Sequence, residues 1–497
     1  MAPKLRYTCM DKDDVAWEKS DEEVEAWERS LLRNSDMNRA IGNLILKYRP
    51  GKAVVLHRPI RGGYNVCYQL EYDDGSSAAM RFPLKGVVKF PEEKVKYEVA
   101  TMRYVAANTT IPIPKIYYYG TGAENPTSLG PFIIMDYIKH DRTMSDALKD
   151  PLLGPDEPHV LDANISNQKL KFLYRQMADI LLQLSTLRFS HIGSLVQDKD
   201  EAVSVSGRPL IHVSGRPLIQ NMNSLVELAG VVPSLLPSKR YSTSTEWYSA
   251  MADMHLAQLA FQHNDAVSDE DDARDKYVAR QLFRRLASSG QLALGLVPED
   301  KHYCESTFRL FSEDLRPSNV LIDQHLRVVG VIDWEFAYFA PAQFSADPPW
   351  WLLLKSPEDW PDGYNSWMEA YEPRLNTFLS VLEEEEKKTR TPSFPAKGSD
   401  LPLSQRMRKS WESKTWMVSY AARNSWSFDF IFWRYLDHAY FGQNEDGDYQ
   451  TRLNLLSEEE IAAMEALVEI KMEESMDRKL VHWEHDNAVA RMAKFML

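Results

Sequence analysis

Cysteines, long apolar runs and an apolar leader are all scarce or missing in these 497 residues. Only three cysteines occur, Cys9, Cys67 and Cys304, and none has CxxC spacing, so neither a disulfide framework nor a zinc site is expected. The first residues lack the apolar core of a secretion signal, and the longest apolar runs are far shorter than the roughly 20 residues that span a bilayer. We therefore expect a reducing compartment, the cytosol, and no membrane partner.

Positive charge is also in deficit, with 58 basic against 72 acidic residues and a net charge of −14. A nucleic-acid-binding protein needs a basic face, and a negative overall field repels phosphate backbones. Nucleic-acid partners are therefore not expected, whereas a local basic pocket for a small phosphate ligand is still allowed. The P-loop, GxGxxG, GxSxG and HExxH patterns are absent as well.

Hydrophobic patterning divides the chain into four parts: residues 1–51, 52–138, 139–345 and 346–497. The first part is helical and acidic, and we expect its first helix to begin at Ser20. The second part contains short strands and one helix, including a hairpin around the turn at residues 73–76. The third is mostly helical before it returns to short strands, and the fourth is helical and rich in tryptophan.

Two segments are unusual in sequence. VSGRPLI occurs at residues 205–211 and again at 213–219, and two copies are too few for a solenoid, so we expect a duplication in a surface loop. The acidic stretch 265–275 is expected to be a solvated loop, although it could attract a cationic substrate. The tryptophans of the last part are expected in the core, and the last helix is expected over residues 457–479.

Three oxygen-bearing side chains are spaced to converge within residues 311–336. Asp314 and Asn319 are five positions apart, and a hairpin whose turn is centred near residues 324–326 brings Asn319 next to Asp333. Taken singly, such residues are common turn formers. Together, two oxygen ligands beside a third carboxylate suit Mg²⁺, which binds one or two protein oxygens plus substrate phosphates. The third carboxylate, Asp314, can then accept a proton from a hydroxyl group, as in a kinase.

The stretch FSEDLRPSNVLIDQHLRVVGVIDWEF resembles the Asp-x-x-x-x-Asn catalytic loop and the hairpin-borne metal aspartate of aminoglycoside-phosphotransferase-like kinases. It is most similar to the fungal branch of that family, in which the metal aspartate lies in an Ile-Asp-Trp-Glu context. The resemblance covers about residues 52–440. It implies a two-lobed α+β protein-kinase-like fold, with a small antiparallel-sheet lobe, a large helical lobe and ATP in the cleft between them.

The same resemblance implies the roles of individual residues. Asp314 would be the base that orients the acceptor hydroxyl, while Asn319 and Asp333 would hold Mg²⁺. Arg81 occupies the place of the phosphate-gripping basic residue, and Glu98 that of its partner glutamate on a helix. The loop that covers the phosphates and the strand whose backbone binds adenine supply the remaining candidates: Gly62, Gly63, Tyr64, Asn65, Asp136 and Ile138.

The Arg81–Glu98 pair also follows from the residue pattern. Glu98 shares one helical face with Val95 and Met102, and a carboxylate on an apolar stripe needs a partner. Counting across the hairpin turn places Arg81 opposite about Tyr68, a few residues from the glycine pair. On sequence grounds alone, a plain structural salt bridge explains this pair equally well.

We expect an ATP- and Mg²⁺-dependent transfer of the γ-phosphoryl group to a hydroxyl of a small molecule. Glu98 and Asp314 are 216 positions apart, and no Ala-Pro-Glu segment follows Asp333, so the activation loop of a protein kinase is not expected. A protein kinase is nevertheless the third hypothesis. The acceptor and the oligomeric state are left unspecified by the sequence.

The second hypothesis is a pseudokinase that binds nucleotide or a partner without turnover. Three departures favour it: Ser312 where histidine is common in the family, Arg81 in place of lysine, and Trp334-Glu335 after the metal aspartate where protein kinases have Phe-Gly.

Overall fold

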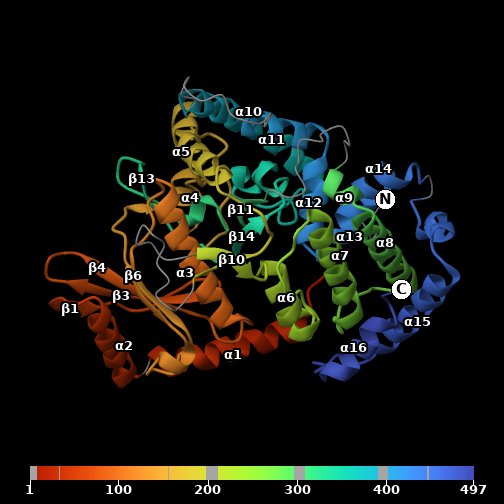
Figure 1. Ribbon diagram of the computed structural model, residues 1–497, viewed down its shortest axis with the longest axis horizontal. Coiled ribbons are helices and arrows are strands. Elements are labelled where there is room, and N and C mark those ends of the chain that lie inside the picture. Colours follow the sequence, from red (N-terminus) through yellow and green to blue (C-terminus); the bar gives the residue numbers. More distant parts are fainter. Residues whose placement is uncertain are drawn as a thin grey trace.

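The computed structural model describes residues 8–32, 34–154, 156–197, 211–295, 308–389, 401–444 and 447–496. A small lobe built on an antiparallel sheet lies beside a larger helical lobe (Figure 1). This arrangement confirms the expected two-lobed α+β, protein-kinase-like fold.

The sheet of the small lobe has the strand order β1-β3-β4-β6-β5, with β2 paired to β3. Its strands are β1 (Ala53–Leu56), β2 (Ile60–Arg61), β3 (Asn65–Tyr72), β4 (Ser77–Pro83), β5 (Ile116–Gly120) and β6 (Phe132–Asp136). The helix of this lobe, α3 (Pro91–Asn108), starts with a proline, whose fixed φ suits the first helical position. Helix α3 runs between the sheet and the large lobe, so its buried side chains can reach both (Figure 1).

The β3–β4 hairpin fixes the position of Arg81. Gly75 has a φ of +78° in the turn, a conformation that costs glycine no steric penalty. Strand β4 resumes at Ser77, so Arg81 pairs with Cys67 and not with Tyr68, one position from the expected register. Cys67 and Arg81 both line the cavity between the lobes.

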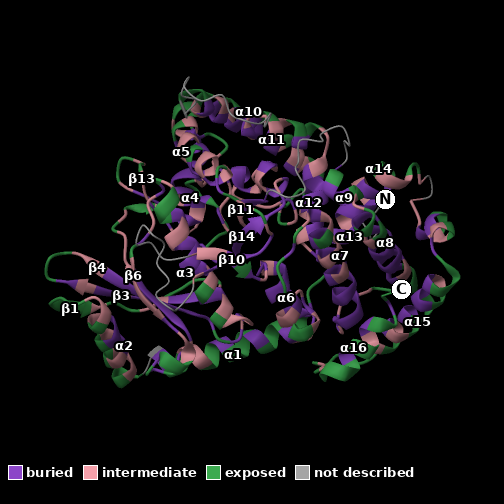
Figure 2. Cartoon of the chain, in the orientation of Figure 1, coloured by how far each residue is buried: buried purple, intermediate pink, exposed green. Residues whose placement is uncertain are grey.

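Two helices precede the sheet, α1 (Asp14–Leu32) and α2 (Ser35–Tyr48). The expected start of the first helix at Ser20 is wrong, because the Asp13 carboxylate accepts a hydrogen bond from Ala16 N at 3.0 Å and begins the helix earlier. Ser20 instead lies inside α1, where its hydroxyl donates to Gly86 O at 3.2 Å. Helix α1 runs along the lower edge of the molecule from the sheet to α6 (Gln220–Leu228), with an exposed outer side (Figures 1 and 2).

The large lobe is built from helices that surround three small antiparallel sheets. Its first helices are α4 (Met144–Leu148), α5 (Asn167–Ser185), α7 (Ser244–Phe261), α8 (Glu270–Ser288) and α9 (Gln291–Leu294). Its later helices are α10 (Gly363–Thr389), α11 (Leu403–Glu412), α12 (Thr415–Arg423), α13 (Phe428–Ile431), α14 (Asp437–Phe441), α15 (Glu458–Glu474) and α16 (His485–Ala493). The strands are β7 (Arg142–Thr143), β8 (Arg188–Phe189), β9 (Ser194–Gln197), β10 (Ile211–Gly215), β11 (Phe308–Ser312), β12 (Val320–Ile322), β13 (Val328–Val331) and β14 (Ala337–Ala340). Among the helices in the described ranges, none is both long and apolar enough to cross a bilayer.

The hairpin expected within residues 311–336 is formed by β12 and β13. Val320 pairs with Val331, and Ile332 N donates to Asn319 O at 2.9 Å. The last residues before and after the hairpin therefore lie side by side, as its spacing predicts.

The second VSGRPLI copy is not a surface loop. Its first residues form the end of β10, and Gly215 lies so close to α3 that an added Cβ would be 2.7 Å from the Tyr97 ring. Arg216 pairs with Glu93 of the same helix at 2.7 Å. This copy therefore fastens α3 to the large lobe, whereas residues 205–210 of the first copy lie outside the described residues.

Two further expectations for the large lobe are corrected. Most of the acidic stretch 265–275 belongs to α8, because Asp269 caps this helix and its acidic first turn complements the helix dipole. The last expected helix, 457–479, ends at Glu474, and a separate helix, α16, follows. The tryptophans expected in the core are mostly buried: Trp351, Trp367, Trp411, Trp416, Trp426 and Trp433.

Candidate active site

A cavity of about 1090 Å³ lies between the lobes and is lined by residues of both. Ten of the eleven residues expected at the site line it: Gly62, Gly63, Tyr64, Asn65, Arg81, Asp136, Ile138, Asp314, Asn319 and Asp333. The eleventh, Glu98, is 1% exposed and lies behind Arg81. The volume lies at the upper end of the range found for small-molecule sites, which is about 300–1,000 Å³.

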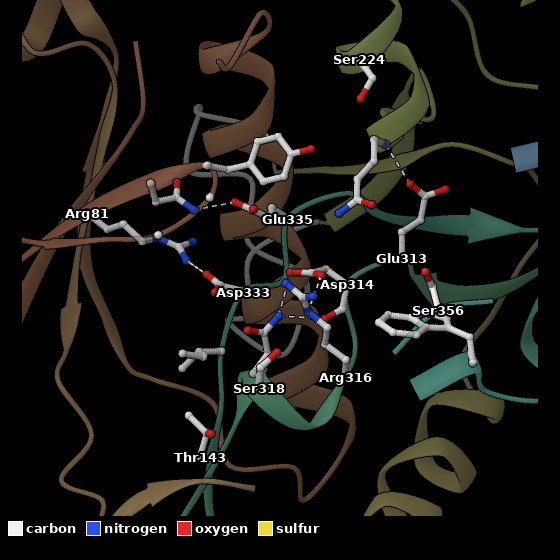
Figure 3. Close-up of a pocket in the computed structure, with 18 of the residues that line it drawn as sticks. Arg81, Thr143, Ser224, Glu313, Asp314, Arg316, Ser318, Asp333, Glu335 and Ser356 are labelled. Atoms are coloured by element: carbon white, nitrogen blue, oxygen red, sulfur yellow. Dashed lines mark hydrogen bonds and ion pairs between the residues drawn. The ribbon is translucent and has the colours of Figure 1, made fainter. Parts of the chain in front are cut away.

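Asp314 is held in place by its neighbours Arg316 and Asn319. The Nδ2 of Asn319 donates to the backbone oxygen of Asp314 at 2.8 Å and to its Oδ2 at 2.7 Å. The Nε of Arg316 lies 2.9 Å from Oδ1 (Figure 3). Burial raises the pKa of Asp314 to about 6, although the positive charge of Arg316 opposes that shift. The carboxylate is therefore oriented and largely ionised at neutral pH.

Asp333 faces the small lobe directly. Its φ of +56° is a left-handed conformation, which is uncommon for any residue but glycine and tends to occur at functional sites. The guanidinium of Arg81 pairs with Asp333 through Nη1 and with Glu98 through Nη2, and Figure 3 shows Arg81 and Asp333 pointing at each other. A lysine has a single ammonium group and lacks this two-sided fork. Arginine in place of lysine at position 81 therefore fits the pairing with both Asp333 and Glu98.

The amide oxygen of Asn319 and one carboxylate oxygen of Asp333 fit a hard cation. The Nδ2 of Asn319 is used by Asp314, and Oδ1 of Asp333 accepts from Arg81, so Asn319 Oδ1 and Asp333 Oδ2 are the atoms left to bind. Mg²⁺ suits such an incomplete set, because it takes one or two protein oxygens together with waters and phosphates. In the part of the chain that the structure describes, no three His, Cys, Asp or Glu side chains are grouped to enclose a metal.

The glycine pair leaves open space beside the cavity. Gly62 N donates to Asn65 O at 2.8 Å, which closes the loop on itself. A Cβ added to Gly63 would meet nothing within 4 Å, so no protein atom fills the space that its hydrogen leaves. The Tyr64 ring contacts Phe336 edge to face at 5.2 Å, and the loop is thereby joined to the segment that follows Asp333.

The expected adenine-binding strand ends at the cavity. The backbone N–H of Asp136 donates to Lys115 O at 2.9 Å, and that of Tyr137 to Ser77 O at 3.1 Å. These two amides are therefore used in backbone hydrogen bonds. Ile138 is the next residue along the cavity wall.

Sequence reasoning missed a buried ion pair next to these residues. Lys94 of α3 contacts the Oε2 of Glu335, and both side chains are at most 3% exposed. Asn65 joins them, since its Oδ1 accepts from Lys94 at 2.6 Å and its Nδ2 donates to Glu335 at 2.7 Å. Burial lowers the pKa of Lys94, although the negative charge of Glu335 opposes that shift. Burial would raise the pKa of Glu335, but the positive charges of Lys94 and Arg81 outweigh it, so this pKa is lowered as well.

These three residues, which we name the Asn65–Lys94–Glu335 cluster, connect the glycine loop, α3 and the segment after Asp333. The sequence could have indicated that Lys94 is buried, because it lies one helical turn before Glu98 on the same face of α3. No pattern in the sequence pairs it with Glu335, which is 241 positions away.

Glu313 was also missed, although it precedes the expected base. It lines the cavity on the side away from Arg81, where its Oε2 accepts from Gln220 N at 2.8 Å (Figure 3). Burial raises the pKa of Glu313 to about 7, against the opposing charge of Arg423.

The fold and this cavity are those of a two-lobed, protein-kinase-like domain. The chain belongs to the phosphotransferase enzyme family, whose model matches residues 57–373, more than half of the chain. The expected family is therefore confirmed.

Curated relatives include yeast proteins named altered inheritance of mitochondria protein 9. The protein of Zygosaccharomyces rouxii is 32% identical over 142 residues, which cover 28% of this chain and 21% of that relative. The protein of Meyerozyma guilliermondii is 25% identical over 311 residues, 58% of this chain and 48% of that relative. The chain thus matches about a fifth to a half of the length of these relatives.

Solved structures with a similar fold include an ADP-bound aminoglycoside phosphotransferase and an ethanolamine kinase of Plasmodium vivax. The first is 14% identical with a TM-score of 0.38 and covers 89% of this chain and 99% of its own. The second is 10% identical with a TM-score of 0.40 and covers 96% and 94%.

The names of the yeast relatives contradict the expected cytosolic location, because those relatives are described as mitochondrial. The expectation relied on the lack of an apolar leader. Mitochondrial transit segments are amphipathic and rich in arginine and serine, so that absence does not separate the cytosol from mitochondria.

Proposed function

We propose that the protein transfers the γ-phosphoryl group of ATP to a hydroxyl of a small molecule, with Mg²⁺ bound. The observation that carries this proposal is the convergence of Asp314, Asn319 and Asp333 with the Arg81–Glu98 pair at one large cavity. A base, two oxygen ligands and a phosphate-binding cation are the parts that phosphoryl transfer requires of a kinase.

Asp314 has the role of the base in this proposal. The acceptor hydroxyl attacks the γ-phosphorus, the bond from that phosphorus to the β–γ bridging oxygen breaks, and ADP leaves. The hydroxyl proton passes to the Asp314 carboxylate, which Asn319 and Arg316 hold in a fixed orientation. Asn319 and Asp333 would hold Mg²⁺, whose positive charge would offset the charge of the phosphates.

The small lobe has the role of binding the nucleotide. Arg81 would exchange its contact with Asp333 for one with a phosphate oxygen while Glu98 keeps its guanidinium in place. The backbone amides of the loop at Gly62 and Gly63 would approach the phosphates. Ile138 would offer its backbone to adenine, because the amide of Asp136 is used in the sheet.

The test is phosphate transfer from radiolabelled ATP into a metabolite extract, with Asp314→Ala as the blank. We expect a labelled small molecule with the wild-type protein and none with the variant, while both bind Mg-ATP. Full turnover by Asp314→Ala would refute its role as the base. Mg-ATP binding without turnover in any extract would favour the pseudokinase, and labelled protein in place of a labelled metabolite would favour the protein kinase.

From the names of the yeast relatives we also propose a mitochondrial location. A carboxyl-terminal fluorescent fusion of the full-length protein should coincide with a mitochondrial dye, and a diffuse signal would contradict the proposal.

A further inference from the structure

The linker that joins the two lobes, residues 137–141, is held at both ends by backbone hydrogen bonds. In the small lobe, Tyr137 N donates to the oxygen of Ser77, the first residue of β4, at 3.1 Å. In the large lobe, Asp141 N donates to the oxygen of Ile322, the last residue of β12, at 2.9 Å. The residues between these two bonds therefore have a fixed place on the cavity wall.

Ile138 has one backbone group that is free and one that is used. Its side chain lies beside Gly330 of β13, where an added Cβ would be 2.5 Å from Ile138 Cδ1. Its carbonyl oxygen accepts a hydrogen bond from the ring of His140, whose Nδ1 is 2.8 Å away, and its N–H has no partner among the described residues. Since a carbonyl oxygen only accepts, Nδ1 must be the protonated nitrogen of His140. At Ile138 the cavity wall thus presents a free donor next to an occupied acceptor.

The ring of His140 is held in this position by its surroundings. It is half-buried, lines the same cavity and lies next to the ring of Tyr137, with the two centroids 5.9 Å apart. The cavity also has apolar side chains that can cover a flat base: Ala79, Met135, Leu321 and Ile332. Leu321 is close to Ile138, since both reach the space beside Gly330. The base of a nucleotide and the His140 ring would therefore meet at the same part of the wall.

Adenine and guanine place different demands on such a wall. Adenine has an acceptor, N1, and the N–H of Ile138 can pair with it without help from the carbonyl oxygen. Guanine has an acceptor, O6, directly beside a donor, N1–H. If O6 pairs with the Ile138 N–H, the guanine N1–H points to the Ile138 oxygen, where the His140 ring narrows the approach of a second donor. A donor left without a partner in a closed site costs free energy, so the arrangement favours adenine.

We propose that His140 is a specificity-determining residue that selects ATP over GTP as the phosphoryl donor, because it occupies the carbonyl oxygen of Ile138. The inference rests on the proposed function, since it requires the base of the donor nucleotide to lie at the linker. It adds which nucleotide the site takes and which side chain makes that choice. The selectivity is a difference between two affinities, so it can be measured without turnover.

The test is isothermal titration calorimetry of the full-length protein with ATP, GTP and inosine triphosphate (ITP) in the presence of Mg²⁺. ITP has the O6 and N1–H of guanine but lacks its 2-amino group, so it separates the contact at the carbonyl oxygen from simple exclusion of that group. We expect the wild-type protein to bind ATP at least tenfold more tightly than GTP or ITP. Binding of GTP or ITP as tight as that of ATP would overturn the inference.

Two variants then test the side chain itself. His140→Ala frees the carbonyl oxygen of Ile138 and should bind GTP and ITP about tenfold more tightly than the wild type does, with less than about a threefold change for ATP. His140→Asn keeps an N–H donor at the place of Nδ1, because its amide nitrogen is the same number of bonds from Cα, and should retain the selectivity. His325→Ala, at an exposed position, is the matched control and should behave as wild type.

The outcomes separate the two proposals. The same ratio of ATP to GTP affinity in His140→Ala as in the wild type, or a loss of selectivity in His140→Asn, would overturn the role of His140 while phosphotransfer stands. Failure of the wild-type protein to bind any of the three nucleotides would overturn the proposed function, and this inference with it.

Discussion

Replacing Lys94 by methionine is expected to destabilise the protein severely. The side chain of Lys94 is 1% exposed and its ammonium group lies against Glu335, whose side chain is 3% exposed. Methionine fills a similar volume but carries no charge, so Lys94→Met leaves the Glu335 carboxylate buried without its cation. Breaking a buried pair in this way typically costs about 3–5 kcal/mol, because one uncompensated charge remains in a low-dielectric site.

A loss of that size is a large part of the total stability of a folded protein, which is commonly about 5–15 kcal/mol. The measurement is the free energy of unfolding in urea, followed by tryptophan fluorescence. Lys96→Met makes the same change at an exposed position of the same helix and should cost less than about 0.5 kcal/mol. The double variant Lys94→Met/Glu335→Met removes both charges and should recover at least half of the loss.

The reasoning would be refuted if Lys94→Met lost less than about 1 kcal/mol, or if the double variant lost the sum of both single losses. The cluster also has a functional readout. Asn65 lies directly after the glycine loop and loses its contact with Lys94 in the variant, so the KM for ATP should rise even where the protein remains folded.

Three other outcomes are expected. Burial raises the pKa of Asp347 from 3.8 to about 7, so the stability of the wild type is full below pH 3.8 and falls as the pH rises through 7. Asp347→Asn does not titrate and should therefore gain up to about 4 kcal/mol in free energy of unfolding, relative to wild type, between pH 4 and pH 8. An equal difference between the two proteins at both pH values in urea unfolding would contradict this. Gly215→Ala should lower the free energy of unfolding by about 1–3 kcal/mol, because the new Cβ would lie 2.7 Å from the Tyr97 ring; the same change at Gly207 in the other VSGRPLI copy is the matched comparison, and an unchanged urea midpoint for Gly215→Ala would contradict the contact. Arg81→Lys should weaken ATP binding by calorimetry roughly tenfold, since one ammonium cannot hold both carboxylates, and wild-type affinity would show that the fork is dispensable.

The parts of the site that lie within one hairpin could be predicted from the sequence. The turn between β12 and β13 sets the register, and the register places Asn319 beside Asp333 whatever the rest of the chain does. The Arg81–Glu98 pair was predictable for a similar reason, because helical periodicity puts the glutamate on the buried face of α3. The hairpin register of Arg81 was one residue off, since it depends on where β4 resumes after its turn.

The contacts that sequence reasoning missed depend on how distant segments approach each other. Lys94 meets Glu335 only because α3 lies against the segment that follows the β12–β13 hairpin. Met10 reaches Trp426 only because the N-terminal segment crosses to the large lobe. Neither approach has a local signature, because propensity and periodicity describe single elements and not their docking.

The small-lobe helix and the duplicated segment show the same limit. The second VSGRPLI copy reads as a loop because it holds a glycine and a proline. The glycine is needed for close approach to Tyr97, and that need becomes visible only when α3 and β10 are placed together.

The central claim is that Asp333 holds Mg²⁺ together with ATP in the cavity between the lobes. Isothermal titration calorimetry of ATP with Mg²⁺ and with EDTA tests it directly, for the wild-type protein, for Asp333→Ala and for the exposed control Asp362→Ala. The account predicts that Mg²⁺ strengthens ATP binding to the wild type and to the control and has no such effect on Asp333→Ala. Full magnesium dependence in Asp333→Ala would contradict it.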